Sequence, residues 1–314
     1  MSLNVMRTRG PNPLSLDDDL IDQILTSLPS FADLQSVVVS SNVFYGVFNV
    51  RPSSIVDAIA HNEIGPALPE ALRACRYRAT DPWPVDGGGL APITCIEARS
   101  LSRNAAVVKG LEDVFSSRYK DRSSRTSKLN FTESWRFHRA MYTMSLFTAA
   151  FPGNELYRER DVSNIQRKQT ERTAFLTRFP NDELLGIYFA SRFLVRLLRW
   201  SVVAGQGTEL WDRRAYSAWA ASFSPNLIWS IYSKAEMLND IGPDMEEASD
   251  NTLDSYIFPS ISTILKQRGA EDDLQSVSIL DENYRHQDKC QMCNTVRGRN
   301  LWNETSASRL CRVA

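Results

Sequence analysis

The sequence predicts an all-α protein. Apolar residues recur three and four positions apart in segment after segment of the 314-residue chain, which is the period of an amphipathic helix. The two-residue alternation of a half-buried strand persists nowhere for more than a few positions, so a sheet is not expected. No segment repeats with a shared signature. We therefore expect helices in irregular packing, without obvious repeats.

Composition and charge are those of an ordinary globular chain. Hydrophobic residues make up 43% and charged residues 23%, which argues against wholesale disorder and against a coiled coil. The 36 basic and 37 acidic residues nearly cancel, so no general attraction to nucleic acid or to a membrane surface is expected. The five cysteines are too few, and odd in number, for a secreted disulfide scaffold. Residues 1–16 lack the apolar core of a signal peptide, so we expect an intracellular protein of the cytoplasm or nucleus.

The chain is expected to begin with a disordered lead-in over residues 1–13, followed by three short helices over residues 14–48. Ser15 as N-cap and three aspartates in the first turn predict the start of the first helix, and Pro29 predicts its end. The second helix is expected from Asp33 to about Val39, although its run of valines also suits a strand. The apolar residues of the third helix are Val43, Phe44, Val47 and Phe48.

A helical continuation is expected over residues 49–79. Pro52 suits the first turn of one helix and Gly65 its exit, and a second helix is expected from about Pro69 to Arg78. Residues 80–93 then contain three prolines and three consecutive glycines, which predicts a loop or linker.

The remaining residues, 94–314, are expected to form a helical C-terminal domain. Its predicted helices cover residues 105–119, 131–151, 155–178, 181–204, 209–221, 225–238 and 253–266. The most apolar segment, Leu184–Val203, is long enough to span a bilayer, but it carries Arg192, Arg196 and Arg199 on one helical face. Each arginine would cost about 2.5–3.5 kcal/mol near the membrane centre, so a core helix with a polar stripe is expected instead.

Residues 14–48 show a recognisable order of motifs. A leading leucine is followed by an acidic turn, an amphipathic I-L-x-x-L helix, Leu-Pro, Asp-Leu and a Val-Ser-x-x-Phe-like segment. This segment resembles an F-box. NEIGPALPEALRACR at 62–76, SWRFHRAMY at 134–142 and CQMCNTVRGRNLWNE at 290–304 are similar to F-box proteins of filamentous fungi, especially basidiomycetes. Two positions depart from the motif: Asp17 replaces the usual proline, and Ser41-Asn42 lies where a basic residue is common.

The resemblance implies a substrate-recognition adaptor of an SCF-type (Skp–cullin–F-box) ubiquitin ligase. Such a chain is not an enzyme and needs no cofactor. It binds a Skp-type linker subunit and, through it, a cullin–RING ligase. It also binds a protein substrate, a role that the resemblance assigns to the C-terminal domain at 94–314. The residues that the resemblance assigns to the linker contact are Leu16, Leu20, Ile24, Leu28, Pro29, Leu34, Val39 and Phe44.

Elementary packing agrees with this resemblance, because three helices of this length cannot bury all of their apolar residues against one another. Two alternatives remain. The three helices can be an internal part of one domain, with their leucines fully buried, or the chain can be a non-catalytic helical scaffold with a degenerate F-box and no ubiquitin role.

Two further sequence patterns were weighed as functional sites, and neither predicts one. His286, Cys290, Cys293 and Cys311 are four side chains of the two types that zinc commonly binds, but the second close pair of ligands is missing, so ordinary reduced cysteines are preferred and no metal is expected. The chain has no G-x-S-x-G, H-E-x-x-H or phosphate-loop motif, and His138 among aromatic and apolar neighbours is expected to be a packing residue rather than a base.

Overall fold

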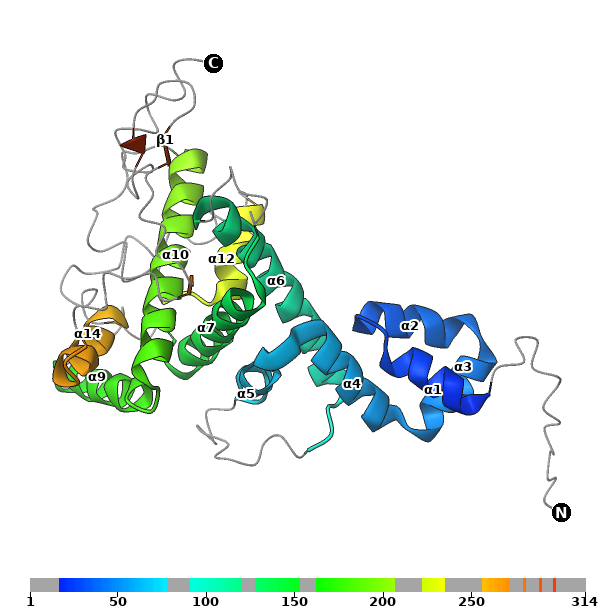
Figure 1. Cartoon of the computed structure of the whole chain (residues 1–314). Coiled ribbons are helices and arrows are strands. Elements are labelled where there is room, and N and C mark those ends of the chain that lie inside the picture. The colour runs from blue at the N-terminus through cyan, green and yellow to red at the C-terminus, as the bar shows by residue number, and fades with distance from the viewer. Residues whose placement is uncertain are drawn as a thin grey trace.

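The computed structural model describes residues 17–77, 91–119, 128–152, 162–206, 222–234, 256–270, 279–280, 288–289 and 296–297. The expected all-α class is confirmed for this part of the chain (Figure 1). The helices are α1 (Asp18–Thr26), α2 (Phe31–Ser40), α3 (Asn42–Val50), α4 (Pro52–Ile64), the 3-10 turn η1 (Gly65–Ala67), α5 (Leu68–Arg76), α6 (Cys95–Tyr119), α7 (Phe131–Ala150), α9 (Val162–Leu176), α10 (Asn181–Gln206), α12 (Pro225–Ser233) and α14 (Phe258–Gln267). One antiparallel pair of two-residue strands, β1 (Asp288–Lys289) and β2 (Val296–Arg297), is the described exception to the expectation of no sheet.

Several sequence expectations fall outside the described residues. They are the lead-in at 1–13, Leu16, most of the linker at 80–93, the helix at 209–221, and His286, Cys290, Cys293 and Cys311.

The starts of α1, α2, α6 and α14 differ from expectation, and α14 begins at Phe258 rather than at residue 253. The N-cap of α1 is Asp17 rather than Ser15, and that of α2 is Ser30, whose hydroxyl accepts a hydrogen bond from Asp33 N. The α6 helix begins at Cys95, ten residues earlier than expected. There Thr94 N donates to the Glu97 carboxylate at 2.7 Å and Glu97 N donates to Thr94 Oγ1 at 3.2 Å, which is a capping box.

The valine run of α2 is helical, so the strand alternative is wrong. The α7 helix begins as predicted at Phe131. Asn130 and Glu133 form a complete capping box there, with both hydrogen bonds at 2.9 Å.

The described apolar residues form two separate clusters. The smaller one joins α1, α2, α3 and α4, and its buried members are Ile21, Leu25, Leu34, Val47, Ile55 and Ile59. The larger cluster joins the second half of α4 to α5, α6, α7, α9, α10, α12 and α14. Ile55 and Ile59 of α4 belong to the first cluster, whereas Ala60 and Ile64 belong to the second. The core that begins in α1 therefore extends beyond Phe48, the expected boundary of the three-helix unit.

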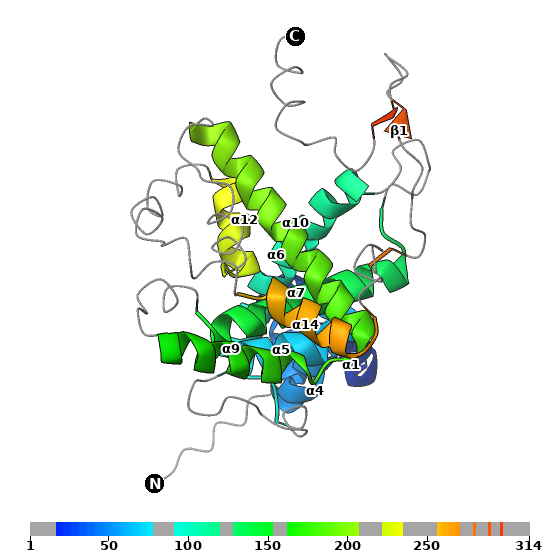
Figure 2. The same ribbon diagram turned by 90° about the vertical axis from the view of Figure 1, so that its left-hand side faces the viewer.

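This division is visible in the shape of the molecule. Helices α1–α3 lie at one end, and α4 connects them to the larger helical body (Figure 1). Within that body α7 and α10 pack on each other, while α9 and α14 pack together beside α10 (Figure 2). We call α1–α4 the N-terminal unit.

The apolar α10 helix is a core helix. Leu184, Ile187, Leu194 and Leu198 are buried, while the Arg196 guanidinium donates to the Tyr119 hydroxyl at 3.1 Å and the Arg192 guanidinium lies over the Tyr188 ring. No helix in the described ranges has the length and apolarity to cross a membrane.

Candidate partner-binding surface

The other helices of the chain cover only part of the apolar face of α1. Ile21 and Leu25 are fully buried against the other helices of the N-terminal unit. Leu20 and Ile24, each one position earlier, remain 48% and 38% exposed. Residues four apart lie on one side of a helix, so these two side chains form a continuous strip, which we call the α1 ridge. The ridge is an unpartnered apolar surface within the described structure.

The other residues assigned to the linker contact have different environments. Val39 is 76% exposed at the end of α2, and Pro29 is exposed after α1. Leu28 and Phe44 are half-buried against the small cluster. Leu34 differs from its expected role, because it is only 6% exposed and packs inside the cluster. It therefore supports the unit from within.

Two exposed apolar residues of α3 were not expected at this surface. Tyr45 and Val50 are both exposed although their helix also supplies the buried Val47. Val43, Phe44, Val47 and Phe48 pack in or against the small cluster as their spacing suggests, but α3 is apolar on its other side as well, so apolar residues also reach solvent there. Apolar exposure on the N-terminal unit thus extends over α1, α2 and α3.

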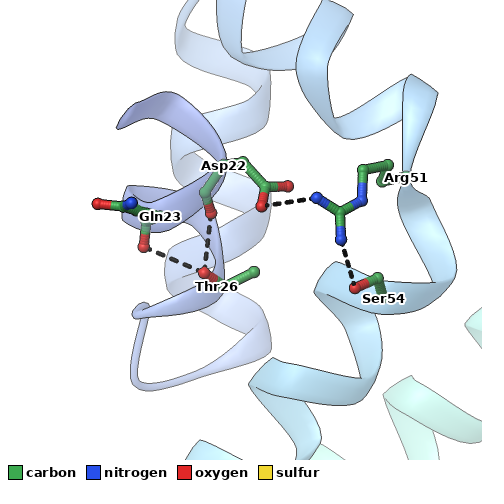
Figure 3. A network of polar contacts seen from close by, with 5 residues as sticks. All are labelled: Asp22, Gln23, Thr26, Arg51 and Ser54. Atoms are coloured by element: carbon green, nitrogen blue, oxygen red, sulfur yellow. Dashed lines mark hydrogen bonds and ion pairs between the residues drawn. The ribbon is translucent and has the colours of Figure 1, made fainter. Parts of the chain in front are cut away.

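Polar contacts fix α1 on α4. The Asn62 amide donates to the carbonyls of Thr26 and Leu28 at 2.8 and 2.9 Å, which satisfies acceptors that the end of α1 leaves free. Arg51 forms an ion pair with Asp22 at 3.2 Å and donates to the Ser54 hydroxyl at 3.4 Å (Figure 3). The exposed ion pair contributes less than about 1 kcal/mol, but the amide contacts are directional. The α1 ridge is consequently presented by a helix of defined orientation.

Glu63 links the N-terminal unit to the larger helical body. One carboxylate oxygen accepts a hydrogen bond from Phe31 N, at the start of α2, at 3.0 Å. The other oxygen accepts from the Ser102 hydroxyl of α6 at 2.8 Å. A single half-buried side chain on α4 thereby connects α2 with α6 and limits rotation between the two clusters.

His138 lies beside the Glu112 carboxylate, an arrangement that catalytic histidines also have. Its Nε2 is 2.7 Å from Glu112 Oε2, and Ser134 also donates to Glu112. Burial alone would raise the pKa of Glu112, but His138, the Ser134 hydrogen bond and the charge of Lys109 together outweigh burial and lower that pKa. Ser134 and His138 both form hydrogen bonds with the Glu112 carboxylate. His138 is therefore not positioned as a base for the Ser134 hydroxyl. The three residues hold α6 and α7 together.

Metal binding has no support among the described residues. They contain no group of three or more His, Cys, Asp or Glu side chains that could hold an ion. Of the described cysteines, Cys75 is half-buried, and burial is the main reason that the pKa of its thiol is raised; Cys95 is exposed.

Comparisons with known proteins do not identify a relative. No family model, no curated protein and no solved structure matches the chain. The function must therefore be argued from the order of motifs in residues 14–48 and from the exposed surface of the N-terminal unit.

Proposed function

We propose that the chain is a substrate-recognition adaptor of an SCF-type ubiquitin ligase, and that its N-terminal unit binds a Skp-type linker subunit. The observation that carries the proposal is the α1 ridge. The unit fills its own core with other residues, yet Leu20, Ile24 and Val39 remain in solvent within the segment that resembles an F-box.

The energetics of the ridge favour a partner. Burying a leucine or isoleucine side chain completely is worth about 1.5–3 kcal/mol, so the remaining exposure of Leu20 and Ile24 corresponds to about 1 kcal/mol each. A few such side chains at the centre of an interface commonly dominate its affinity. The ridge and Val39 are the exposed apolar side chains that a linker would cover, whereas the buried Leu34 contributes by shaping the unit.

The mechanism that follows is proximity. An adaptor performs no bond chemistry; it holds a target near the ubiquitin-conjugating machinery, so that transfer becomes effectively intramolecular. Such a role requires a defined geometry between the linker contact and the target contact. In support of this requirement, the shared helix α4 and the two hydrogen bonds to Glu63 hold the N-terminal unit on the larger helical body.

The alternative is a helical scaffold with a degenerate motif and no ubiquitin role. One observation favours it: Asp17 stands where the motif usually has proline, and its side chain makes no capping hydrogen bond at the start of α1. The two functions differ in whether a Skp-type linker binds.

A pull-down with a purified Skp-type linker tests the proposal. Replacing both ridge residues, Leu20→Asp with Ile24→Asp, should weaken binding at least about 100-fold, because two apolar contacts become desolvated charges. Both side chains are exposed, so circular dichroism should show unchanged helical content. The matched control is Ile96→Asp with Phe131→Asp, which replaces two equally apolar, exposed residues outside the N-terminal unit and should bind like wild type.

The outcomes are distinct. If the wild-type chain fails to bind the linker, the scaffold is the better description. If the ridge variant and the control lose binding equally, the contact lies elsewhere.

A further inference from the structure

Arginine and aromatic side chains alternate along one side of α10. Tyr188, Arg192, Arg196 and Trp200 follow one another at intervals of four residues, so they share one side of the helix. Arg196 is exposed and Trp200 is 41% exposed, whereas Tyr188 and Arg192 are half-buried. We call Arg192, Arg196 and Trp200 the α10 stripe. It places positive charge beside an exposed indole ring on the larger helical body.

The end of α6 and helix α12 support the stripe. The α12 helix packs on both α6 and α10 (Figure 1). Arg196 donates to the Tyr119 hydroxyl at 3.1 Å, and the Arg118 guanidinium carbon lies 5.4 Å from the centroid of the Trp200 ring. Tyr232 of α12 packs on the same ring, with the two ring centroids 5.7 Å apart. The last turn of α6 thus adds a further guanidinium group beside the stripe, and the indole is held in place.

The charge of this surface is positive. Its described cations are three arginines and the residue that follows α12: Arg118, Arg192, Arg196 and Lys234. Helix α12 carries no charged residue, and α10 has no acidic residue after Glu183. The last two turns of α6 contain two carboxylates, Glu112, which is already bonded to His138, and Asp113. Positive charge therefore outweighs negative charge over the described part of this surface.

Aromatic groups, rather than carboxylates, contact the arginines of the stripe. The Arg192 guanidinium carbon lies 5.6 Å from the centroid of the Tyr188 ring, and Arg196 has the Tyr119 hydroxyl; neither forms an ion pair within the described ranges. Burial is the main reason that the pKa of Arg118 is lowered, and two neighbouring tyrosines oppose that effect. A guanidinium group has several N–H donors and the hydroxyl takes only one of them, so Arg196 can still bind a carboxylate through two hydrogen bonds.

These observations favour an occupant with anionic groups next to an apolar one. We propose that the α10 stripe binds an acidic segment of a partner polypeptide, with glutamate or aspartate carboxylates on the arginines and an apolar side chain on Trp200. The dimensions agree, because Arg192 and Trp200 lie about 12 Å apart along the helix axis and an extended peptide of five residues spans at most about 17 Å. Single-stranded nucleic acid is less suited, since Arg118 and Tyr232 already pack on the ring that a base would need for stacking.

This surface is separate from the α1 ridge, because none of its residues belongs to the N-terminal unit. The inference therefore goes beyond the proposed function and does not depend on the linker contact. On an adaptor, the α10 stripe is part of the surface that selects the target.

The test follows the tryptophan indole N–H resonances of the full chain by NMR, with the Trp200 signal assigned from Trp200→Phe. The probe is a capped peptide in which two glutamates stand on each side of a leucine. The same peptide with glutamine for every glutamate keeps the shape without the charge, and pentauridylate supplies phosphates and bases. A dissociation constant of about 0.1–1 mM is expected for the acidic peptide at low salt.

The expected result is a saturable shift of the Trp200 signal with the acidic peptide and at least about 10-fold weaker binding of the glutamine peptide. Raising the salt concentration from about 20 to about 300 mM should weaken the acidic peptide several-fold, because exposed charges are screened. Arg196→Gln should weaken it about 10-fold, and Arg196→Lys less, since lysine keeps the charge without the fork of donors.

The matched control is Arg103→Gln. It removes one exposed arginine from α6, about 22 Å along the helix axis from Arg118, and should leave binding unchanged. Equal loss in Arg103→Gln and Arg196→Gln would show that only the net charge matters and would overturn the inference.

Other outcomes also decide against the proposal. Equal affinity of the two peptides, or no Trp200 shift at about 10 mM acidic peptide, would overturn it. Tighter binding of pentauridylate would make the stripe a nucleic-acid site. The chain has its own acidic sequence at 236–254, so Glu246→Gln with Glu247→Gln is a further variant: unchanged affinity is expected, whereas a gain of about 10-fold would show that this sequence occupies the stripe. None of these results bears on binding of the linker subunit.

Discussion

Glu63 offers the sharpest test of how the two clusters are joined. Glu63→Ala removes the acceptor of both Phe31 N and the Ser102 hydroxyl, at 3.0 and 2.8 Å in the wild type. Hydrogen bonds to a charged group are worth about 1.5–3 kcal/mol each, but the site is half-buried and water replaces part of the loss. We expect the free energy of unfolding to fall by about 2–4 kcal/mol.

Glu63→Gln is the matched control, since its amide oxygen can accept from Phe31 N while its NH₂ group donates to the Ser102 oxygen. This variant should lose less than about 1 kcal/mol, because both contacts survive in neutral form.

Urea denaturation measures both variants, and amide hydrogen exchange at Phe31 reports on the first contact directly. Exchange should accelerate in Glu63→Ala and not in Glu63→Gln. A double-mutant cycle with Ser102→Ala isolates the second contact. Equal stability of the two Glu63 variants would refute the assignment of Glu63 as the link between α2 and α6.

Three further predictions concern other contacts. Gly110→Ala should destabilise the fold by about 1–3 kcal/mol and change tryptophan fluorescence, because a Cβ there would lie 2.5 Å from the Trp229 ring. Unchanged fluorescence would contradict the packing of Trp229 on Gly110. The lowered pKa of Glu112 predicts a contribution to stability that is fully present above the ordinary pKa of 4.5 and is lost as pH falls through the lower pKa of the folded state. Glu112→Gln should flatten this acid dependence in urea titrations at several pH values. An unchanged profile would count against the His138 contact. Asn62→Ala should lower the free energy of unfolding by about 0.5–2 kcal/mol, because the carbonyls of Thr26 and Leu28 at the end of α1 lose their donor. Thermal unfolding measures this loss, and an unchanged melting temperature would contradict the role of Asn62 in holding α1.

Sequence periodicity was sufficient for the helices whose ends carry strong local signals. The α7 helix was predicted within one residue at each end, and α10 within two, since Asn130 and Pro180 precede them with few competing patterns. The early start of α6 was missed although Thr94 and Glu97 have capping-box spacing. The adjacent proline and glycine run of the expected linker masked that signal.

The candidate surface could be predicted only in part. The pattern of α1 correctly indicates a wide apolar face, but it does not say which half α4 covers. That depends on Ile55 and Ile59, some thirty residues away, which bury Ile21 and Leu25 and leave Leu20 and Ile24 outside. For the same reason Leu34 was assigned to the surface. The contacts of Glu63 with Phe31 and Ser102 join residues far apart in sequence, so no local sequence pattern predicts these contacts.

The continuity of α4 through both clusters sets the angular relation between the two ends of the molecule. Ile59 and Ala60 are consecutive residues that belong to different cores. One residue inserted between them would turn the α1 ridge by about 100° about the helix axis and shift it by about 1.5 Å, while leaving each cluster's own residues unchanged. The number of residues in α4 therefore determines the direction in which the α1 ridge faces relative to the larger helical body.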